Sequence, residues 1–383
     1  MSVTAAKGFT ASGIAAGIKE NGNPDLALVV NNGPKLAAAG VFTSNRVKAA
    51  PVLWSEQVLK GGLVSAVVLN SGGANACTGP KGFQDTHATA EKVAEVLGQN
   101  AGEVAVASTG LIGLLLPMDK LLPGVEQAAA QLSEHGGEKA AIAIKTTDSV
   151  HKTSVVTGDG WTVGGMAKGA GMLAPGLATM LVVLTTDADV EGDVLDRALR
   201  AATRTTFDRV DSDGCMSTND TVLLLASGAS QVTPDEAEFA EAVRKVCDDL
   251  GQQLIRDAEG ASKDIKVEVV NAASEDDAVE VGRSIARNNL LKCAIHGEDP
   301  NWGRVLSAIG TTQAAFEPDQ LNVAINGVWV CKNGGVGEDR DKVDMRYREV
   351  HIVADLAAGA QTATIWTNDL TADYVHENSA YSS

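Results

Sequence analysis

The sequence predicts a layered α/β protein with two or three domains. Its 383 residues exceed the roughly 100 to 200 residues of one domain and suffice for a substantial buried core. Hydrophobic residues make up 44% of the chain, aromatic residues only 4%, and 40 residues are glycine. Small residues of this kind allow helices and strands to pack closely. Short β-rich runs also alternate with helical patterns, as they do in α/β proteins.

Residues 1–190 form the first expected domain. Branched and apolar residues predict four strands in it, at 26–30, 39–43, 65–70 and 103–109. Helical periodicity predicts helices at 83–98 and at 117–132. The stretch SVVTGDGWTV at 154–163 predicts a β-hairpin, because Gly-Asp-Gly tolerates the positive φ angles of a tight turn.

Two further segments are expected, a small α/β segment at 191–262 and a C-terminal α/β domain at 263–383. In the small segment, an amphipathic helix at 191–206 leads through a loop to a strand at 221–228. Pro234 then starts a helix that runs to about Arg256, with acidic residues in the first turn, where the helix dipole favours them. The C-terminal domain has a predicted helix at 276–295 and predicted strands at 265–272, 322–330 and 348–356.

The charge of the chain argues against two classes of partner. Lys and Arg number 31 against 49 Asp and Glu, and the formal charge of −18 repels nucleic-acid phosphates and anionic lipid. No segment reaches the roughly 18 consecutive apolar residues of a membrane-spanning helix, and MSVTAAKGFTASG lacks the apolar core of a secretory signal. We therefore expect a cytoplasmic protein that binds neither nucleic acid nor membranes.

The cysteines and histidines do not predict a metal site. The five cysteines are odd in number, far apart and never in CxxC spacing, which is typical of a reducing compartment. The six histidines are equally scattered, with no HExxH motif. The sequence also lacks the glycine-rich nucleotide motifs and the GxSxG motif of serine hydrolases.

The candidate catalytic group is Thr179, which follows a turn rich in Gly and Pro within KGAGMLAPGLATMLVVLTTDA, residues 168–188. A threonine hydroxyl is a weak nucleophile, and its own α-amine can serve as its base once the chain is cut in front of it. Pro175 fixes φ, Gly176 permits unusual backbone angles, and Ala178 leaves the scissile carbonyl unobstructed. Taken alone, however, such a turn before a strand is most often only a turn.

The same stretch resembles the processing motif KGSGMxxPxxATML of the ornithine acetyltransferase family, the glutamate N-acetyltransferases of arginine biosynthesis. The likeness extends over nearly the whole chain. Seven further motifs match in the correct order: NSGGANACTG at 70–79, STGLIG at 108–113, TTDS at 146–149, STNDTVLLLASG at 217–228, RDAEGASK at 256–263, GEDPNWGR at 297–304, and the tail DLTADYVHENSAY with its terminal hydroxyl residue.

The resemblance implies a role for each matching residue. Thr179 matches the nucleophile that self-cleavage between Ala178 and Thr179 exposes, so that chains of 178 and 383 − 178 = 205 residues stay together. Thr109 and Gly110 match the pair that forms the oxyanion hole. The substrate-contacting positions are matched by Thr146 (or else Thr147), Lys168, Thr179, Glu259, Asn378 and Ser383. Alone, the lysine, the glutamate and the asparagine could equally be surface or turn residues.

The resemblance also implies an α-β-β-α sandwich around the nucleophile, a tail that returns to the active site, and an α2β2 heterotetramer. The implied reaction needs no cofactor and no metal: N-acetylornithine acetylates Thr179, ornithine leaves, and glutamate takes the acetyl group to give N-acetylglutamate. Two alternatives stay open, a self-processed aminopeptidase or amidase of the same architecture and an uncut amino-acid-binding protein. The sequence does not decide whether acetyl-CoA is a second donor.

Two residues depart from the family pattern, Ala170 in place of the usual Ser and Ser383 in place of the usual terminal Thr. The first removes a hydroxyl close to the scissile turn, and the second keeps its hydroxyl. Two further motifs, at 217–220 and 301–304, carry no assigned chemistry, and we expect their polar side chains to fix loops through hydrogen bonds to the backbone.

Overall fold

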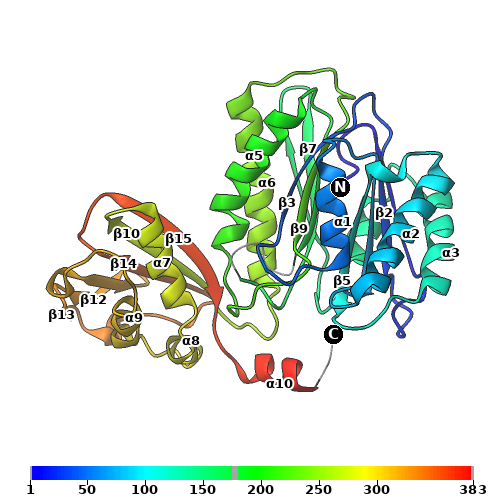
Figure 1. Ribbon diagram of the computed structural model, residues 1–383. Coiled ribbons are helices and arrows are strands. Elements are labelled where there is room, and N and C mark those ends of the chain that lie inside the picture. Colours follow the sequence, from blue (N-terminus) through cyan, green and yellow to red (C-terminus); the bar gives the residue numbers. More distant parts are fainter. Residues whose placement is uncertain (1, 175–179, 381–383) are drawn as a thin grey trace. The chain divides into compact units, whose positions relative to one another are not determined.

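The computed structural model describes residues 2–174 and 180–380, which fall into two compact units (Figure 1). The first unit comprises residues 2–208 and 215–257, and the second comprises residues 209–214 and 258–380. Residues 191–208 and 215–257 thus contribute their α-helices and strand to the first unit. No helix in the described ranges combines the length and the apolar character needed to cross a membrane.

The first unit contains a four-stranded sheet of order β1-β2-β4-β5. Its strands are β1 (Phe9–Ile14), β2 (Leu26–Asn31), β4 (Ala66–Gly73) and β5 (Val104–Leu111). The edge strand β5 is parallel to its neighbour β4, and the other two pairs are antiparallel. The helices α2 (Gly79–Leu97) and α3 (Met118–Ala130) pack on one face of this sheet over an apolar cluster that includes Leu28, Val68 and Val106.

A five-stranded sheet of order β3-β9-β8-β7-β6 faces the first. Its strands are β3 (Ala37–Phe42), β6 (Lys152–Thr157), β7 (Thr162–Lys168), β8 (Leu181–Thr186) and β9 (Thr221–Ala226). The helices α5 (Gly192–Thr205) and α6 (Glu236–Arg256) cover its outer face. Helix α5 buries Leu195, Ala198, Leu199 and Ala202, because their spacing of three and four places them on one side of the helix.

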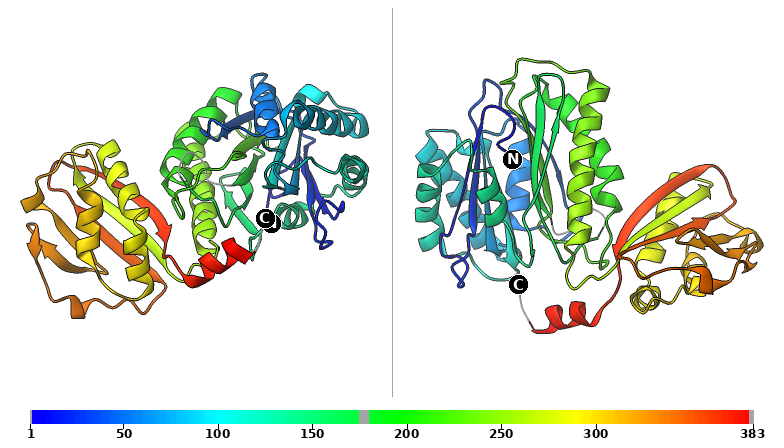
Figure 2. Two further views of the ribbon diagram at one scale, coloured as in Figure 1. Left: turned by 60° about the horizontal axis from the view of Figure 1, so that its bottom comes forward. Right: turned by 180° about the vertical axis from the view of Figure 1, so that it is seen from behind.

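The inner faces of the two sheets share one core. Val29, Leu69 and Ala107 of the first sheet belong to the same buried cluster as Met166, Val183 and Leu223 of the second. The helices α1 (Ala50–Leu59) and α4 (Gly137–Ala143) contact strands of both sheets. Figures 1 and 2 show α2 and α3 on one side of this double sheet and α5 and α6 on the other, which confirms the α-β-β-α sandwich.

The second unit is a smaller α/β structure with a six-stranded sheet of order β13-β12-β11-β14-β10-β15. Its strands are β10 (Asp264–Ala272), β11 (Asn322–Ile325), β12 (Val328–Lys332), β13 (Gly335–Val336), β14 (Glu349–Asp355) and β15 (Gln361–Asn368). Its α-helices are α7 (Glu275–Ala286), α8 (Asn289–His296), α9 (Trp302–Ile309) and α10 (Ala372–Ala380). Short 3-10 helices lie at Ala101–Glu103 in the first unit, at Phe207–Arg209 where the chain passes from the first unit to the second, and at Pro318–Gln320 and Arg340–Lys342 in the second unit.

Two predictions for the second unit were wrong in detail. The single helix expected at 276–295 is two helices, because Asn288 leaves the helix and its side chain accepts the N–H of Leu291 to begin α8. The single strand expected at 322–330 is the hairpin of β11 and β12. Asn326 and Gly327 form its two-residue turn with φ angles of 46° and 82°, as an Asn-Gly turn requires. In the first unit, by contrast, the hairpin expected at 154–163 is confirmed as the antiparallel pair of β6 and β7.

Candidate active site

Thr109 and Gly110 lie where strand β5 departs from regular geometry. The pairing of β4 with β5 shifts register at Gly72 and Gly73, opposite these two residues. Gly110 has a φ of +128°, and a Cβ atom on it would lie 2.5 Å from the nitrogen of Gly73. Only glycine therefore fits this position. The Thr109 side chain is buried, with 2% of its surface exposed.

Lys168 ends strand β7 and lies beside Thr109. Its Nζ donates a hydrogen bond to Thr109 Oγ1 at 3.3 Å, although the two residues are 59 positions apart. Only 2% of Lys168 is exposed. Its backbone pairs with Leu181, the first residue of β8. The lysine and the threonine of the expected site therefore meet next to the strand that follows Met180.

A buried ionic cluster supports Lys168. The Asp148 carboxylate accepts hydrogen bonds from the Gly169 N–H at 2.6 Å, the Thr146 N–H at 3.0 Å and Lys152 Nζ at 2.7 Å. Lys152 Nζ also contacts Asp257 Oδ2 at 2.5 Å. Burial alone raises the pKa of Asp148, but the charges of Lys168 and Lys152 outweigh it and hold that pKa well below its ordinary value. Asp148 is thus a buried carboxylate between two lysines.

Thr146 and Thr147 lie in the loop that this cluster fixes. Both are half-buried. The Thr146 N–H is bound by Asp148, and the carbonyl oxygen of Lys145, just before it, accepts a hydrogen bond from Lys19 Nζ at 2.7 Å. The loop is therefore held from both sides, and either threonine stays a candidate for contacting substrate.

The motif at 217–220 fixes a loop, as expected. Asn219 Nδ2 donates to the carbonyl oxygens of Ala74 and Ser108 at 2.6 and 2.7 Å, and Asn219 Oδ1 accepts the Thr218 hydroxyl at 2.6 Å. Ser108 immediately precedes Thr109. One buried amide therefore joins the start of β9, in the second sheet, to the strand of the first sheet that carries Thr109.

Glu259 and Asn378 meet in the second unit. Asn378 Nδ2 donates to Glu259 Oε2 at 3.0 Å and to the carbonyl oxygen of Tyr374 at 3.0 Å. Glu259 precedes Gly260, whose φ is +60° and whose carbonyl oxygen accepts the Thr371 hydroxyl at 2.6 Å. The loop at 256–263 and helix α10 are thereby joined, and α10 presents Asn378 to the glutamate.

Other site residues expected from the sequence lie outside the described residues. These are Ala178 and Thr179 at the expected cleavage point, and Ser383 at the C-terminus. Their described neighbour is Met180, whose N–H donates to Asp220 Oδ1 at 3.0 Å. Sequence reasoning assigned no role to Asp148 or Lys152 and expected of Asp220 only that it helps to fix the loop at 217–220. The motif TTDS does contain Asp148, but the partners of this carboxylate lie on separate segments.

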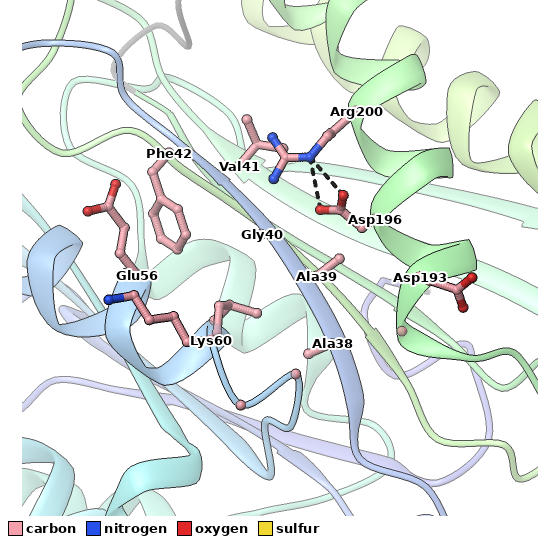
Figure 3. A pocket seen from close by; sticks show the side chains of 14 residues that line it. Ala38, Ala39, Gly40, Val41, Phe42, Glu56, Lys60, Asp193, Asp196 and Arg200 are labelled. Atoms are coloured by element: carbon pink, nitrogen blue, oxygen red, sulfur yellow. Dashed lines mark hydrogen bonds and ion pairs between the residues drawn. The ribbon is translucent and has the colours of Figure 1, made fainter.

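A pocket of about 670 Å³ lies elsewhere in the first unit (Figure 3). It is lined by β3, the edge strand of the second sheet, together with parts of α1 and α5. Phe42, Lys60 and Arg200 are among its lining residues, and Arg200 Nε binds both carboxylate oxygens of Asp196 at 2.8 and 3.0 Å. None of the expected site residues lines it. Within the described ranges, no group of three or more His, Cys, Asp or Glu residues could hold a metal ion.

Comparison with known proteins gives similarity over the whole chain. Residues 10–383 match the ArgJ family. The arginine biosynthesis bifunctional protein ArgJ of Streptomyces avermitilis is 92% identical over 383 residues, which is the full length of both chains. The protein of the same name from Streptomyces coelicolor is 88% identical over the same length. A crystal structure of ornithine acetyltransferase complexed with ornithine from Mycobacterium tuberculosis is 60% identical, covers 47% of this chain and 96% of that chain, and has a TM-score of 0.45.

Proposed function

The chain belongs to the ArgJ family, and we propose that it is a glutamate N-acetyltransferase of arginine biosynthesis that moves the acetyl group of N-acetylornithine to glutamate. The structural observation that carries this proposal is the buried contact of Lys168 with Thr109. Lys168 pairs with Leu181, the first residue of β8, so the contact lies beside this strand. Thr179 stands two residues before Leu181 in the sequence. A cation and a hydroxyl therefore meet beside β8, the strand that follows the candidate nucleophile in the sequence.

In this proposal Thr179 is the nucleophile and carries the acetyl group between the two substrates. Cleavage between Ala178 and Thr179 frees an α-amine with an ordinary pKa of roughly 7.7 to 8. This amine takes the hydroxyl proton when Thr179 attacks N-acetylornithine and returns a proton to the departing ornithine. Glutamate then attacks the acetyl ester, and the same amine acts as base again. The reaction requires no cofactor.

Thr109 and Gly110 form the oxyanion hole. The hydroxyl of Thr109 and the N–H of Gly110 donate to the acetyl oxygen as negative charge develops on it. The contact with Lys168 supports this role, because Lys168 Nζ donates to Thr109 Oγ1 at 3.3 Å and leaves the hydroxyl proton free to point elsewhere. The ammonium also stabilises negative charge nearby.

The substrates share an α-carboxylate, and ornithine adds an ammonium group. Lys168 and Thr146, or else Thr147, supply the cation and hydroxyl that suit the carboxylate. Glu259 supplies the carboxylate that suits the ammonium, and Asn378 orients it through the 3.0 Å hydrogen bond to Oε2. Ser383 completes the proposed contacts with its hydroxyl.

The proposal includes the assembly and the location of the enzyme. The two chains made by cleavage, of 178 and 205 residues, form an αβ unit, and two such units form an α2β2 heterotetramer in the cytoplasm. The odd number and the scattered positions of the five cysteines are compatible with that reducing compartment. Light scattering of the purified enzyme tests the assembly, since a mass of one αβ unit would contradict it.

The test of the reaction is incubation with N-acetylornithine in the presence and absence of glutamate. Stoichiometric formation of N-acetylglutamate supports transfer, whereas release of acetate without glutamate acetylation would identify an amidase instead. Mass spectrometry of the enzyme with N-acetylornithine alone should detect an acetyl group on Thr179. Denaturing electrophoresis adds the control against a binding protein, because an active enzyme runs as two fragments and Thr179→Ala as one.

Acetyl-CoA is a proposed second acetyl donor. The relatives that are 92% and 88% identical over the full chain are both named bifunctional, and this second donor separates bifunctional from monofunctional members of the family. Radiolabelled acetyl-CoA with glutamate should yield labelled N-acetylglutamate. If N-acetylglutamate forms from N-acetylornithine but carries no label from acetyl-CoA, this second activity is absent.

A further inference from the structure

Lys19 carries a half-buried ammonium group that the protein satisfies only in part. It lies in the loop between β1 and β2, which Asp25 holds by accepting three backbone N–H groups of this loop at 2.7 to 3.1 Å. Lys19 Nζ donates to the carbonyl oxygens of Pro24 and Lys145 at 3.1 and 2.7 Å. An ammonium has three N–H groups, and the third has no acceptor among the residues that the structure describes.

The side chain of Lys19 joins two parts of the expected site. A Cβ atom added to Gly72 would lie 3.2 Å from Lys19 Cγ, so the side chain passes directly over the Gly72 backbone. Gly72 of β4 pairs with Gly110 of β5, the residue of the proposed oxyanion hole. The other end of the side chain binds the carbonyl oxygen of the peptide bond between Lys145 and Thr146. Lys19 therefore lies between the strand pair at Gly110 and the loop that carries Thr146.

The charges around Lys19 favour an added anion. Burial lowers the pKa of Lys19, and the positive charge of Lys168 lowers it further. The charges of Asp25 and Asp148 oppose this change, but both carboxylates already have partners. Asp25 binds the backbone of the Lys19 loop, and Asp148 binds Lys152 Nζ at 2.7 Å. Two ammonium groups are thus close enough for their charges to interact, and a carboxylate bound beside them would be attracted by both.

We propose that Lys19 is a further substrate-binding residue, whose third N–H group binds the α-carboxylate of N-acetylornithine and of glutamate. The inference rests on the proposed function. The ammonium is held at the peptide bond that leads into Thr146, a candidate for contacting the same carboxylate. The α-carboxylate is the negatively charged group that both substrates share, so one fixed cation serves both halves of the reaction. A hydrogen bond between an ammonium and a carboxylate is also stronger than one between neutral groups.

A structural role alone does not account for the charge of Lys19. Carbonyl oxygens can be bound by neutral N–H groups, whereas partial burial of an ammonium costs free energy that an anion compensates. The two roles also predict different results. If Lys19 only ties its loop to Lys145, its loss weakens the binding of every substrate to the same extent. If Lys19 binds the α-carboxylate, its loss matters only for a substrate that carries this charge.

The test is a double-mutant cycle between Lys19 and the substrate carboxylate. The donors are N-acetylornithine and its neutral α-carboxamide, and the measurement is KM, or the inhibition constant where the carboxamide reacts too slowly. Because hydrogen bonds to charged groups change binding about 10-fold to 100-fold, Lys19→Met should raise the KM for N-acetylornithine by that factor. For the carboxamide the constant should rise less than about 3-fold. The kcat should stay near that of the wild type, because the carboxylate is bound equally before and during the reaction.

Two further variants serve as controls. Lys120→Met removes a lysine that packs on the same loop, where its Cδ would lie 3.7 Å from a Cβ atom on Gly17, but Lys120 is exposed. It should leave the KM of both donors unchanged. Lys19→Arg keeps the positive charge and should recover most of the affinity for N-acetylornithine without altering that for the carboxamide.

Equal losses for N-acetylornithine and its carboxamide would overturn the proposal, since they would show that Lys19 only fixes the loop. A rise in the KM of glutamate alone would overturn it too, because it would assign Lys19 to the side-chain carboxylate that N-acetylornithine lacks. A wild type that forms no N-acetylglutamate is a different result and would overturn the proposed function itself. If Lys19→Met does not fold, the same cycle is measured on Lys19→Gln, which keeps an N–H group for a carbonyl oxygen but removes the charge.

Discussion

Lys152 Nζ lies 2.7 Å from Asp148 Oδ1, and both side chains are completely buried. The same ammonium contacts Asp257, and Asp148 in turn binds the N–H groups of Thr146 and Gly169. Gly169 follows Lys168 directly. One ionic cluster therefore holds the two stretches of chain that supply the candidate carboxylate-binding groups.

We expect Lys152→Met to destabilise the protein by about 3–5 kcal/mol, because it leaves two buried carboxylates without their shared cation. Lys35→Met is the control, since Lys35 pairs with Asp189 and Glu191 on the surface and such pairs contribute less than about 1 kcal/mol. The measurement is the free energy of unfolding in urea. A similar loss of unfolding free energy in both variants would show that burial does not make the ion pairs of the cluster more important than those on the surface.

Asp148 should make the protein sensitive to acid. Its pKa in the folded state lies well below the ordinary value of about 3.9, so the folded state binds fewer protons than the unfolded state in acid. The stabilisation by this carboxylate is complete above the unfolded pKa and is lost as the pH falls below it. Asp148→Asn should therefore be less stable at neutral pH but lose less stability between about pH 5 and about pH 3. Parallel curves of unfolding free energy against pH would contradict this.

Much of the layered fold could be predicted from local patterns. The runs at 26–30 and 221–228 are strands because branched, apolar residues pack well between layers, and both are buried in the structure. The Asn-Gly pair at 326–327 was itself a turn signal inside an apparently continuous strand. The residues on both sides of this pair are apolar, so the sequence pattern indicated one continuous strand instead of two.

The candidate site was predictable only in part. Family likeness indicated Thr109 and Lys168, and the structure places their side chains in contact. The ionic cluster behind them could not be predicted, because Lys152 and Asp257 are 105 residues apart, and the motif that contains Asp257 does not indicate its distant partner. Asp220 was expected only to help fix a loop. Its burial and its hydrogen bond with the Met180 N–H, 40 residues away, are not given by sequence pattern alone.

Thr109→Val should lower kcat about 10²-fold to 10³-fold, since it removes one donor of the oxyanion hole while keeping the shape of the side chain. Thr109→Ser should retain most of the activity. Thr186→Val is the matched control, because the Thr186 hydroxyl is equally buried but donates to the Thr162 carbonyl oxygen at the far end of β8. The measurement is kcat for N-acetylglutamate formation on cleaved enzyme. Equal loss in Thr109→Val and Thr186→Val would remove Thr109 from the oxyanion hole.

Gly110→Ala tests the backbone donor beside it. The added Cβ would lie 2.5 Å from the Gly73 nitrogen and 2.6 Å from the Gly72 carbonyl carbon, so β5 must move away from β4 and carry the Gly110 N–H with it. We expect kcat to fall at least about 100-fold and the unfolding temperature to drop. Gly113→Ala separates strain from displacement: Gly113 also has a positive φ, of 87°, but its Cβ would meet nothing within 4 Å. Both variants place an alanine at a positive φ and so share the dihedral strain. Only displacement of the Gly110 N–H can therefore make Gly110→Ala much less active than Gly113→Ala. Equal activities would mean that this N–H takes no part in the reaction.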